Sequence, residues 1–406
     1  MKEVIVLGQG YVGLPVAVEI AKAGFKVFGF DIDSDKIYKL NQGLTNSPDV
    51  TKQEILDLKS KGKLVFTSQI PQTGKCAIFI ITVPTPLKAD RSPDLAMLEN
   101  ACKLIASVVE ADSLIINEST SFIGTLRNFI KPIIENDSGK FNLKFAVAPE
   151  RIDPGSKNWG VINTPRNISG LSQGAIQEAK DFYSKFCVNI KESSQPEVVE
   201  AAKLFENTFR QVNIALVNEF SQIAKEFNFT AHEAIELAAS KPFGFMPFYP
   251  GIGVGGHCIP VDPSYLVYSA EISGIQPKII TTANEVNNLI PIRVANRIQE
   301  KFDNNLQGKR IQIAGISYKT NISDLRESPS LALISELKKL GALVTWFDPL
   351  VESVDTGRDS QLEPGVDLGL IVTPHDSIDF SVWLKYGTLV FDLSSTTKNY
   401  GWPKFL

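Results

Sequence analysis

The residues best suited to chemistry lie in a glycine-rich stretch that runs from Tyr249 through Cys258 to Asp262. Four glycines within six residues predict a backbone that turns sharply or lets another group approach closely. A thiol in such a loop, with an aspartate four residues later, makes Cys258 the best candidate nucleophile in the chain. The alternative is a surface loop with an inert cysteine. His257 is a weaker candidate for the base of this thiol, because successive loop residues rarely face each other.

A second glycine cluster, Gly8-Gln-Gly10-Tyr-Val-Gly13, lies between an apolar strand at 3–7 and a helical pattern at 14–23. The next strand, 25–30, ends at Asp31. This spacing predicts a dinucleotide site, in which the glycine backbone approaches the pyrophosphate and the helix start donates N–H groups. Asp31 would accept hydrogen bonds from the adenosine ribose and repel a 2′-phosphate, which favours NAD over NADP. A mononucleotide or flavin site on the same unit is the alternative.

Polar side chains follow three further predicted strands. The strand 77–83 ends in Pro84-Thr-Pro86, the strand 113–117 in Glu118-Ser-Thr120, and the strand 144–148 in Pro149-Glu-Arg151. Open α/β sheets bind ligands at the carboxyl ends of their strands, so these side chains predict one shared cleft. Each residue taken alone could instead be a helix cap or a turn former.

Residues 197–227 contain no Gly or Pro and predict a helix of about 45 Å. Its apolar residues recur every three or four positions, which is typical of a helix that bridges domains or forms an oligomer seam. Lys203 and Asn207 are one turn apart and project to the same side. The plainer interpretation of this pair is a solvated flank of the helix.

The composition is that of a soluble globular protein of 406 residues, with 43% hydrophobic and 21% charged residues, so two or three domains are expected. A net charge of −4 argues against nucleic acid or an anionic membrane as the main partner. The four cysteines show neither metal-type spacing nor disulfide density, which predicts no metal and a reduced, cytoplasmic protein. The N-terminus reads directly as a strand rather than a signal peptide, and the apolar run at 77–83 is too short to span a bilayer.

A second αβ module begins at a predicted strand, 310–314, and repeats the order strand, Gly loop, helix, Gly, strand and Asp348. Its loop carries Lys319 and Arg326 in place of the three glycines, which suggests a second anionic ligand. The predicted fold is α/β, with two Rossmann-like domains joined by a long central helix and a small helical domain. The predicted domains are 1–195 for NAD, 196–300 for the helical part with the Cys258 loop, and 301–406 for the second nucleotide.

These motifs, in this order, resemble the UDP-glucose/GDP-mannose dehydrogenase family over essentially the whole chain. The matching segments are Gly8–Pro15, Glu118–Thr120, Pro149–Arg151, Glu200–Thr208, Gly255–Asp262 and Tyr318–Pro329. The details look most like the branch that oxidises UDP-N-acetylhexosamines, UDP-GlcNAc 6-dehydrogenases first and UDP-ManNAc dehydrogenases next. The resemblance implies an NAD-dependent, four-electron oxidation of the sugar C6 hydroxymethyl group to a carboxylate. It also implies a place in polysaccharide biosynthesis. The long apolar helix itself predicts a homodimer.

The resemblance further implies roles for individual residues. Cys258 would be the nucleophile that forms a thiohemiacetal and then a thioester. Lys203 and Asn207 would stabilise oxyanions, and Asp262 with Thr120 would position or activate water. Glu150 would be a substrate-side carboxylate. The cofactor contacts implied are Gly8, Gly10, Tyr11, Val12, Gly13, Asp31, Lys36, Thr85, Ser119, Thr120 and Arg326. The substrate contacts implied are Glu150, Arg151, Lys203, Asn207, Phe248, Tyr249, Gly251, Gly255 and Lys319.

Three positions depart from the family pattern. Glucose-oxidising members usually carry Lys at the position of Val261, and many carry a second Glu at the position of Pro154. Both differences favour an N-acetylated sugar and leave open which group activates the hydrolytic water. Ile252 replaces a common proline. Two other classes of function stay open at this point: a two-electron hydroxyacid or alcohol dehydrogenase that has no use for Cys258, and a non-enzymatic nucleotide sensor.

Overall fold

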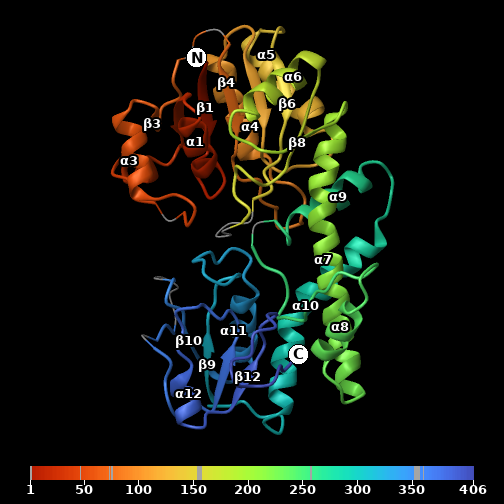
Figure 1. Ribbon diagram of the computed structural model, residues 1–406. Coiled ribbons are helices and arrows are strands. Elements are labelled where there is room, and N and C mark those ends of the chain that lie inside the picture. The colour runs from red at the N-terminus through yellow and green to blue at the C-terminus, as the bar shows by residue number, and fades with distance from the viewer. Residues whose placement is uncertain are drawn as a thin grey trace. The chain divides into compact units, whose positions relative to one another are not determined.

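The computed structural model describes residues 2–45, 47–72, 74, 76–152, 158–256, 258–351, 357–359 and 361–406. Pro154 and His257 therefore lie outside the described residues. The chain divides into two compact units (Figure 1). The first comprises Met1–Glu206 and Ser264–Gly274, and the second comprises Asn207–Pro263 and Ile275–Leu406.

The first unit is built on a sheet with the strand order β3-β2-β1-β4-β5-β6-β7-β8 in its described part. The strands from β3 to β6 run parallel, β7 runs antiparallel to β6, and β8 is parallel to β7. The parallel part brings the carboxyl ends of its strands to one edge of the sheet. The strand bounds are β1 Glu3–Leu7, β2 Lys26–Phe30, β3 Leu64–Thr67, β4 Ile78–Ile81, β5 Leu114–Asn117, β6 Lys144–Val147, β7 Arg166–Gly170 and β8 Ile190–Glu192.

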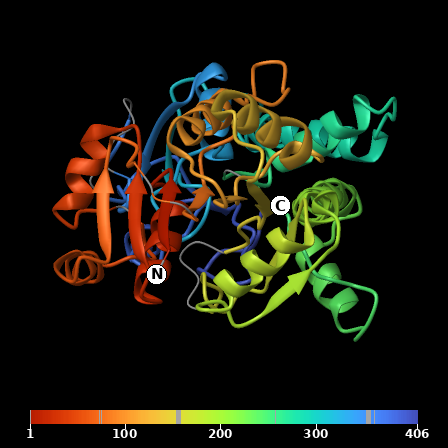
Figure 2. The ribbon, with the colours of Figure 1, turned by 90° about the horizontal axis from the view of Figure 1, so that it is seen from above.

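Helices cover both faces of this sheet because its central strands are apolar on both sides (Figure 2). Val4 and Val6 point into a core shared with α1 and α6, whereas Ile5 and Leu7 point into a core shared with α4 and α5. The helix bounds are α1 Gly13–Lys22, α2 Ser34–Asn41, α3 Lys52–Ser60, α4 Ala96–Val108, the π-helix η1 Leu126–Ile130, α5 Lys131–Ser138 and α6 Gln173–Tyr183.

The long helix predicted at 197–227 is confirmed as α7, Pro196–Glu226. It begins in the first unit and ends in the second. Much of its apolar stripe is exposed, with Phe205 at 66%, Leu216 at 61% and Ile223 at 49%. The segment that the sequence left as helical and irregular contains α8 Ala231–Ala239, α9 Asp262–Glu271 and α10 Lys278–Glu300.

In its described residues, the second unit contains a four-stranded parallel sheet in the order β10-β9-β11-β12. Apolar residues of β9 pack with α10 and α11 in one core, and α12 lies in a separate core. The bounds are β9 Arg310–Ala314, α11 Pro329–Lys339, β10 Leu343–Phe347, β11 Leu368–Ile371, α12 Ser381–Lys385 and β12 Val390–Asp392. Among the described helices of both units, none is long and apolar enough to cross a membrane.

The α/β fold with two Rossmann-like sheets was predicted correctly from the sequence. The predicted strands at 3–7, 310–314 and 343–347 agree residue for residue with β1, β9 and β10. The sequence analysis did not foresee β3, β7 or β8. β3 and β8 are edge strands whose exposed or half-buried residues hide the apolar pattern of a central strand. β7 lies between β6 and β8, and its sequence Arg-Asn-Ile-Ser-Gly is largely polar although most of its residues are buried.

Candidate active site

The first glycine cluster forms the turn between β1 and α1. Gly8 has a φ of +95°, which L side chains rarely adopt, and a Cβ on Gly13 would lie 1.9 Å from the carbonyl oxygen of Gly8. Gly10 differs from both, because it is exposed and, apart from its chain neighbours, no described residue has an atom within 4 Å of the place where its Cβ would be. Val12 supplies no side-chain cap to the start of α1. An accessible backbone beside helix N–H groups without a side-chain cap fits the pyrophosphate of a dinucleotide.

Asp31 lies beside this turn at the end of β2. Its Oδ2 accepts hydrogen bonds from the backbone N–H of Gln9 and from Nζ of Lys36, both at 2.8 Å. Its Oδ1 accepts from the N–H of Asp33 at 3.0 Å. A carboxylate has about four acceptor positions, so the Asp31 carboxylate retains capacity for a ribose hydroxyl. The structure therefore brings together the predicted residues Asp31, Lys36 and the glycine turn.

The loops after β4 and β5 are tied to each other. The hydroxyl of Thr85 donates to the carbonyl oxygen of Thr120 at 2.6 Å, and the hydroxyl of Ser119 donates to that of Val83 at 2.8 Å. The phenol of Tyr265, on the part of α9 that belongs to the first unit, donates to the carbonyl oxygen of Thr85 at 2.9 Å. Thr85, Ser119 and Thr120 thus share one edge of the sheet, as the strand-end pattern predicted.

Glu150, at the loop after β6, is buried and accepts a hydrogen bond from the N–H of Ile152. Burial raises the pKa of the Glu150 carboxyl, and the nearby positive charges of Lys203 and Arg166 oppose this rise. The predicted substrate-side carboxylate and the predicted oxyanion-stabilising lysine are therefore electrostatic neighbours. The next residue, Arg151, forms an ion pair with Glu206 of α7 at 2.6 Å.

A buried ion pair stabilises the carboxyl ends of β5 and β6. Arg166 of β7 lies 2.9 Å from Glu118, and their side chains are 3% and 0% exposed. Arg166 also donates to the carbonyl oxygen of Ala148 at 3.1 Å, and the hydroxyl of Tyr183 donates to Glu118. The ends of β5 and β6 are thereby held by one charged network that the sequence did not reveal.

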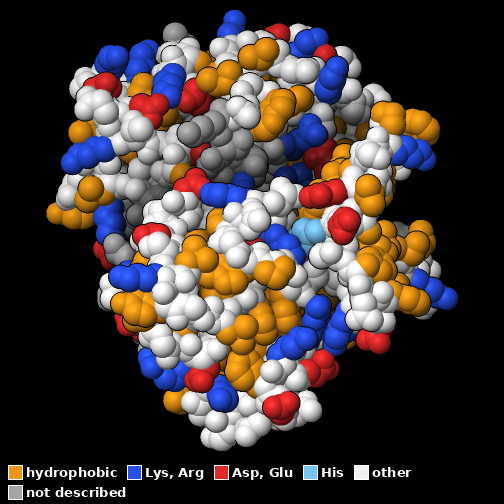
Figure 3. Space-filling model, turned by 60° about the horizontal axis from the view of Figure 1, so that its bottom comes forward, with side chains coloured by type: hydrophobic (Ala, Val, Ile, Leu, Met, Phe, Trp, Pro, Cys, Tyr) orange, Lys and Arg blue, Asp and Glu red, His pale blue; other side chains and the backbone are white. Residues whose placement is uncertain are grey.

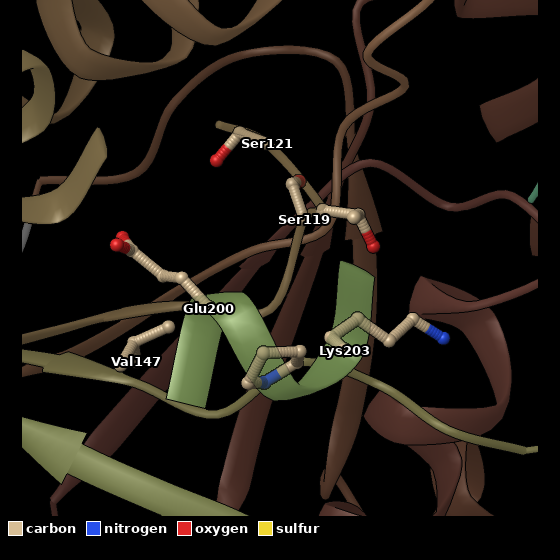
Figure 4. A pocket seen from close by; sticks show the side chains of 7 residues that line it. Ser119, Ser121, Val147, Glu200 and Lys203 are labelled. Carbon is tan, nitrogen blue, oxygen red and sulfur yellow. The ribbon is translucent and has the colours of Figure 1, made fainter. Parts of the chain in front are cut away.

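A small hollow in the first unit collects residues from three elements (Figure 4). The loop after β5 supplies Ser119, Thr120 and Ser121, and α7 supplies Glu200 and Lys203. In Figure 4 the side chains of Glu200 and Lys203 extend from one helical segment in different directions. The loop and the helix therefore border the same hollow, although the carboxylate of Glu200 and the ammonium of Lys203 point away from each other. Its remaining lining residues are Val147 and Pro149.

The candidate nucleophile and the candidate base lie in the second unit, at the start of α9. The N–H of Asp262 donates to the carbonyl oxygen of Cys258 at 2.8 Å, which makes one helical turn of the segment between them. The Asp262 carboxylate is buried and accepts a hydrogen bond from the amide of Asn207 at 2.5 Å. Asn207 is thus buried and engaged, and the solvated-flank interpretation is wrong at this position.

The cysteines have different environments. Burial raises the pKa of the Cys102 thiol to about 12 and that of the Cys187 thiol to about 11, so both stay protonated and inert near neutral pH. Cys258 is partly exposed, as is Cys76. Because their thiols are accessible, Cys258 and Cys76 are the candidates for a nucleophile. Cys258 is favoured because the buried carboxylate of Asp262 lies one helical turn away from it.

The glycines before Cys258 are closely approached by the second αβ module. A Cβ on Gly255 would lie 2.7 Å from Cβ of Tyr318, and one on Gly256 would lie 2.6 Å from its ring. The N–H of Gly256 donates to the carbonyl oxygen of Arg326 at 2.9 Å. The absence of side chains at these two glycines therefore makes room for the side chain of Tyr318. The Cys258 loop packs against the loop that carries Lys319 and Arg326.

The predicted substrate loop at 248–251 is also held on several sides. The ring of Phe248 makes an edge contact with Phe209 of α7, with the ring centroids 5.9 Å apart. Tyr249 stacks on His232 of α8 at 5.3 Å. The N–H of Gly251 donates to the side chain of Asn218 at 2.9 Å. Asn218 and His232 are buried and were not identified from the sequence, because nothing in their spacing distinguishes them from core residues of a helix.

The second Rossmann-like half uses its aspartate differently from the first. Both N–H groups of Ile316 and Ser317 donate to Asp348, which also lies 3.0 Å from Nε2 of His375. Asp348 is fully buried, so it stabilises the loop and is shielded from a ribose. Lys319 lies on the loop held in this way, and the guanidinium of Arg326 is paired with Asp324 at 2.6 Å. The prediction that Arg326 contacts NAD stays a prediction.

Residues 2–187, 197–289 and 312–399 match, in that order, the models of the NAD binding domain, the central domain and the UDP binding domain of the UDP-glucose/GDP-mannose dehydrogenase family. The chain is 36% identical over 369 residues to a UDP-N-acetyl-D-glucosamine 6-dehydrogenase of Pseudomonas aeruginosa, covering 89% of this chain and 86% of that one. It is 35% identical over 393 residues to a UDP-N-acetyl-D-mannosamine dehydrogenase of Pyrococcus horikoshii, covering 95% and 92%. The solved structure of a UDP-D-ManNAc dehydrogenase from Pyrococcus horikoshii superposes with a TM-score of 0.88 at 32% identity, covering 98% of this chain and 97% of that one.

Proposed function

This chain belongs to the UDP-glucose/GDP-mannose dehydrogenase family of NAD-dependent oxidoreductases, and on that premise we propose that it oxidises a UDP-N-acetylhexosamine at C6 to the uronate. UDP-GlcNAc is the favoured substrate and UDP-ManNAc the second candidate. Relatives with these two names are 36% and 35% identical to the chain, which supports an N-acetylated sugar. The epimer depends on a few pocket contacts and has no motif of its own.

The observation that carries the proposal is the buried contact between Asn207 and Asp262, one helical turn from Cys258. A buried carboxylate beside a partly exposed thiol suits a reaction that needs both a nucleophile and a base. A two-electron dehydrogenase or a nucleotide sensor has no use for this pair.

The proposed chemistry begins with loss of a hydride and a proton from the C6 alcohol, which leaves an aldehyde. The Cys258 thiol adds to the aldehyde: a C–S bond forms, and the thiol proton passes to the C6 oxygen. The resulting thiohemiacetal loses a second hydride and its hydroxyl proton to become a thioester. Each oxidation step delivers its hydride to NAD⁺, which is the chemistry that the cofactor supplies. Water then attacks the thioester, the C–S bond breaks, and the carboxylate and the thiol are released.

The chain's own residues are proposed to act on charge and protons. Asp262, with Thr120, accepts a proton from the attacking water, and Asn207 holds its carboxylate in place. Lys203 stabilises the negative charge that develops on the C6 oxygen. Glu150 binds on the substrate side, and Lys319 binds the UDP moiety. The half-buried or buried state of these side chains favours strong electrostatic interactions.

We propose that the functional parts are residues 1–195 for NAD, 196–300 for the central helical part and 301–406 for the UDP-sugar. The proposed assembly is a homodimer through α7, in the cytoplasm, in a pathway of polysaccharide biosynthesis. Exposed apolar residues of α7 and α8 support the dimer, and Figure 3 shows hydrophobic side chains gathered on the side where Figure 1 draws these helices.

The test is NADH release from UDP-GlcNAc, UDP-ManNAc, UDP-GalNAc and UDP-Glc, with the sugar product identified. We expect two NADH per sugar from an N-acetylated substrate. The Cys258→Ala variant should make no uronate, whereas Cys76→Ser, which changes the other partly exposed thiol, should retain wild-type turnover. One NADH per sugar, or full uronate yield from Cys258→Ala, would refute the covalent mechanism.

A further inference from the structure

We propose that Glu200 is a positioning residue for this reaction, because its carboxylate ties the loop that carries Thr120 to the helix that carries Lys203. The inference rests on the proposed function for the roles of Thr120 and Lys203. The contact between Glu200 and the loop is independent of the proposed function, and all its residues belong to the first unit.

The Glu200 side chain spans two elements. It leaves α7 one turn before Lys203, and its two carboxylate oxygens accept separate backbone hydrogen bonds from the segment after Thr120. The N–H of Gly124 donates to Oε2 at 2.6 Å, and the N–H of Leu126 donates to Oε1 at 2.9 Å. Glu200 is only 4% exposed, so water does not compete effectively for these bonds.

The loop has a second set of anchors on its other side. Asn117 donates to the carbonyl oxygen of Ser119 at 3.0 Å, and Thr85 donates to that of Thr120 at 2.6 Å. These bonds tie the loop to the sheet edge, whereas those of Glu200 tie it to α7. The separation between Thr120 and Lys203 is therefore controlled by Glu200, and both residues line the hollow of Figure 4.

The clamp depends on the charge of Glu200. A carboxylate accepts at both oxygens, whereas a protonated carboxyl, or a Gln amide, turns one acceptor into a donor that faces a backbone N–H. Burial raises the pKa of the Glu200 carboxyl to about 7, despite the two backbone N–H donors that lower it. The other charged groups around it are Glu197 and Lys203 of α7 and Arg127 of η1. Glu150, next to the lining residue Pro149, is electrostatically linked to Lys203.

Two measurements test the proposal. In Glu200→Gln, we expect kcat to fall about 10- to 100-fold and the KM for the UDP-sugar to change much less, because Thr120 and Lys203 are displaced while Lys319 and the other proposed substrate contacts are kept. The wild-type kcat should fall as the pH drops through about 7, and the variant should lack this limb. Glu197→Gln is the matched control: it removes a carboxylate one turn away that is paired with Arg127. It should keep the wild-type kcat and retain the acid limb, which shifts to lower pH because Glu197 raises the pKa of Glu200.

The second measurement is amide hydrogen exchange in the wild-type protein, which needs neither a variant nor activity. Protection of the Gly124 and Leu126 amides should fall as the pH drops through about 7. The Asn128 amide, which donates to the carbonyl oxygen of Gly124, is the internal control and should not follow. Because it uses the wild-type protein, this measurement also tests the contact between Glu200 and the loop if Glu200→Gln does not fold.

The outcomes separate the two claims. If the wild type releases no NADH from any UDP-sugar, the proposed function fails, and the exchange data still test the clamp. If the wild type is active but Glu200→Gln retains its kcat and its acid limb, Glu200 is not a positioning residue. Unchanged protection of Gly124 and Leu126 from pH 6 to 8 would overturn the proposal as well.

Discussion

Replacement of Arg166 by Met should strongly destabilise the first unit. The Arg166 guanidinium is 3% exposed, lies 2.9 Å from the Glu118 carboxylate and stacks 4.8 Å from the centroid of the Tyr183 ring. Burial alone would lower the pKa of this guanidinium, but Glu118 and its other neighbours raise that pKa above its ordinary value. The pair is therefore ionised inside the sheet, and its two members depend on each other.

The magnitude follows from what the substitution leaves behind. Met has a similar length but no charge, so Glu118 would remain as a buried carboxylate that keeps only its hydrogen bond from Tyr183. Removal of one partner from a buried ion pair costs about 3–5 kcal/mol. For a unit of this size each kcal/mol lowers the Tm by about 2–4 °C, so a fall of roughly 10 °C is expected.

Chemical denaturation and calorimetry of Arg166→Met, Glu118→Gln and the double variant would measure this effect. The double variant should be more stable than Arg166→Met alone, because no unpaired charge remains buried. The single variant should also raise the pKa of Glu150 further, since Arg166 opposes the effect of burial on that carboxyl. If Arg166→Met stays within about 1 kcal/mol of the wild type, or the double variant is no more stable than the single one, the reasoning is wrong.

Two further predictions concern the cofactor and the assembly. Gly10→Ala should fold normally, because no described residue beyond its chain neighbours has an atom within 4 Å of the added Cβ, yet it should weaken NAD binding by about 10-fold or more in calorimetry, since the pyrophosphate is expected there. Gly174→Ala is the control, and equal NAD affinity of both variants would contradict the assignment. Leu216→Glu, at an exposed position of α7, should dissociate the proposed dimer in analytical ultracentrifugation, whereas Leu384→Glu on α12 should not. A monomeric wild type would rule out this interface.

The sequence by itself determined the central strands, the long helix and the class of chemistry. Continuous apolar runs predicted the central strands, and local glycine geometry placed the first turn, because both depend on neighbours along the chain. The candidate residues Asp31, Lys36, Thr85 and Thr120 follow strand ends, and parallel topology then brings such ends to one edge.

Tertiary structure alone decided which polar groups are buried and what they hold. Glu200, Arg166 and Asn218 look like ordinary helix and strand residues in the sequence, and their importance comes from partners far along the chain. The exposure of Leu216 also depends on packing, because its apolar spacing fits a domain bridge and an oligomer seam equally well. The structure supports Cys258 as the candidate nucleophile in the same way, because the nearby Asp262 is buried against Asn207. The free energy of a charged group depends on its burial, and burial depends on residues that are distant in the sequence, so the sequence pattern alone does not predict it.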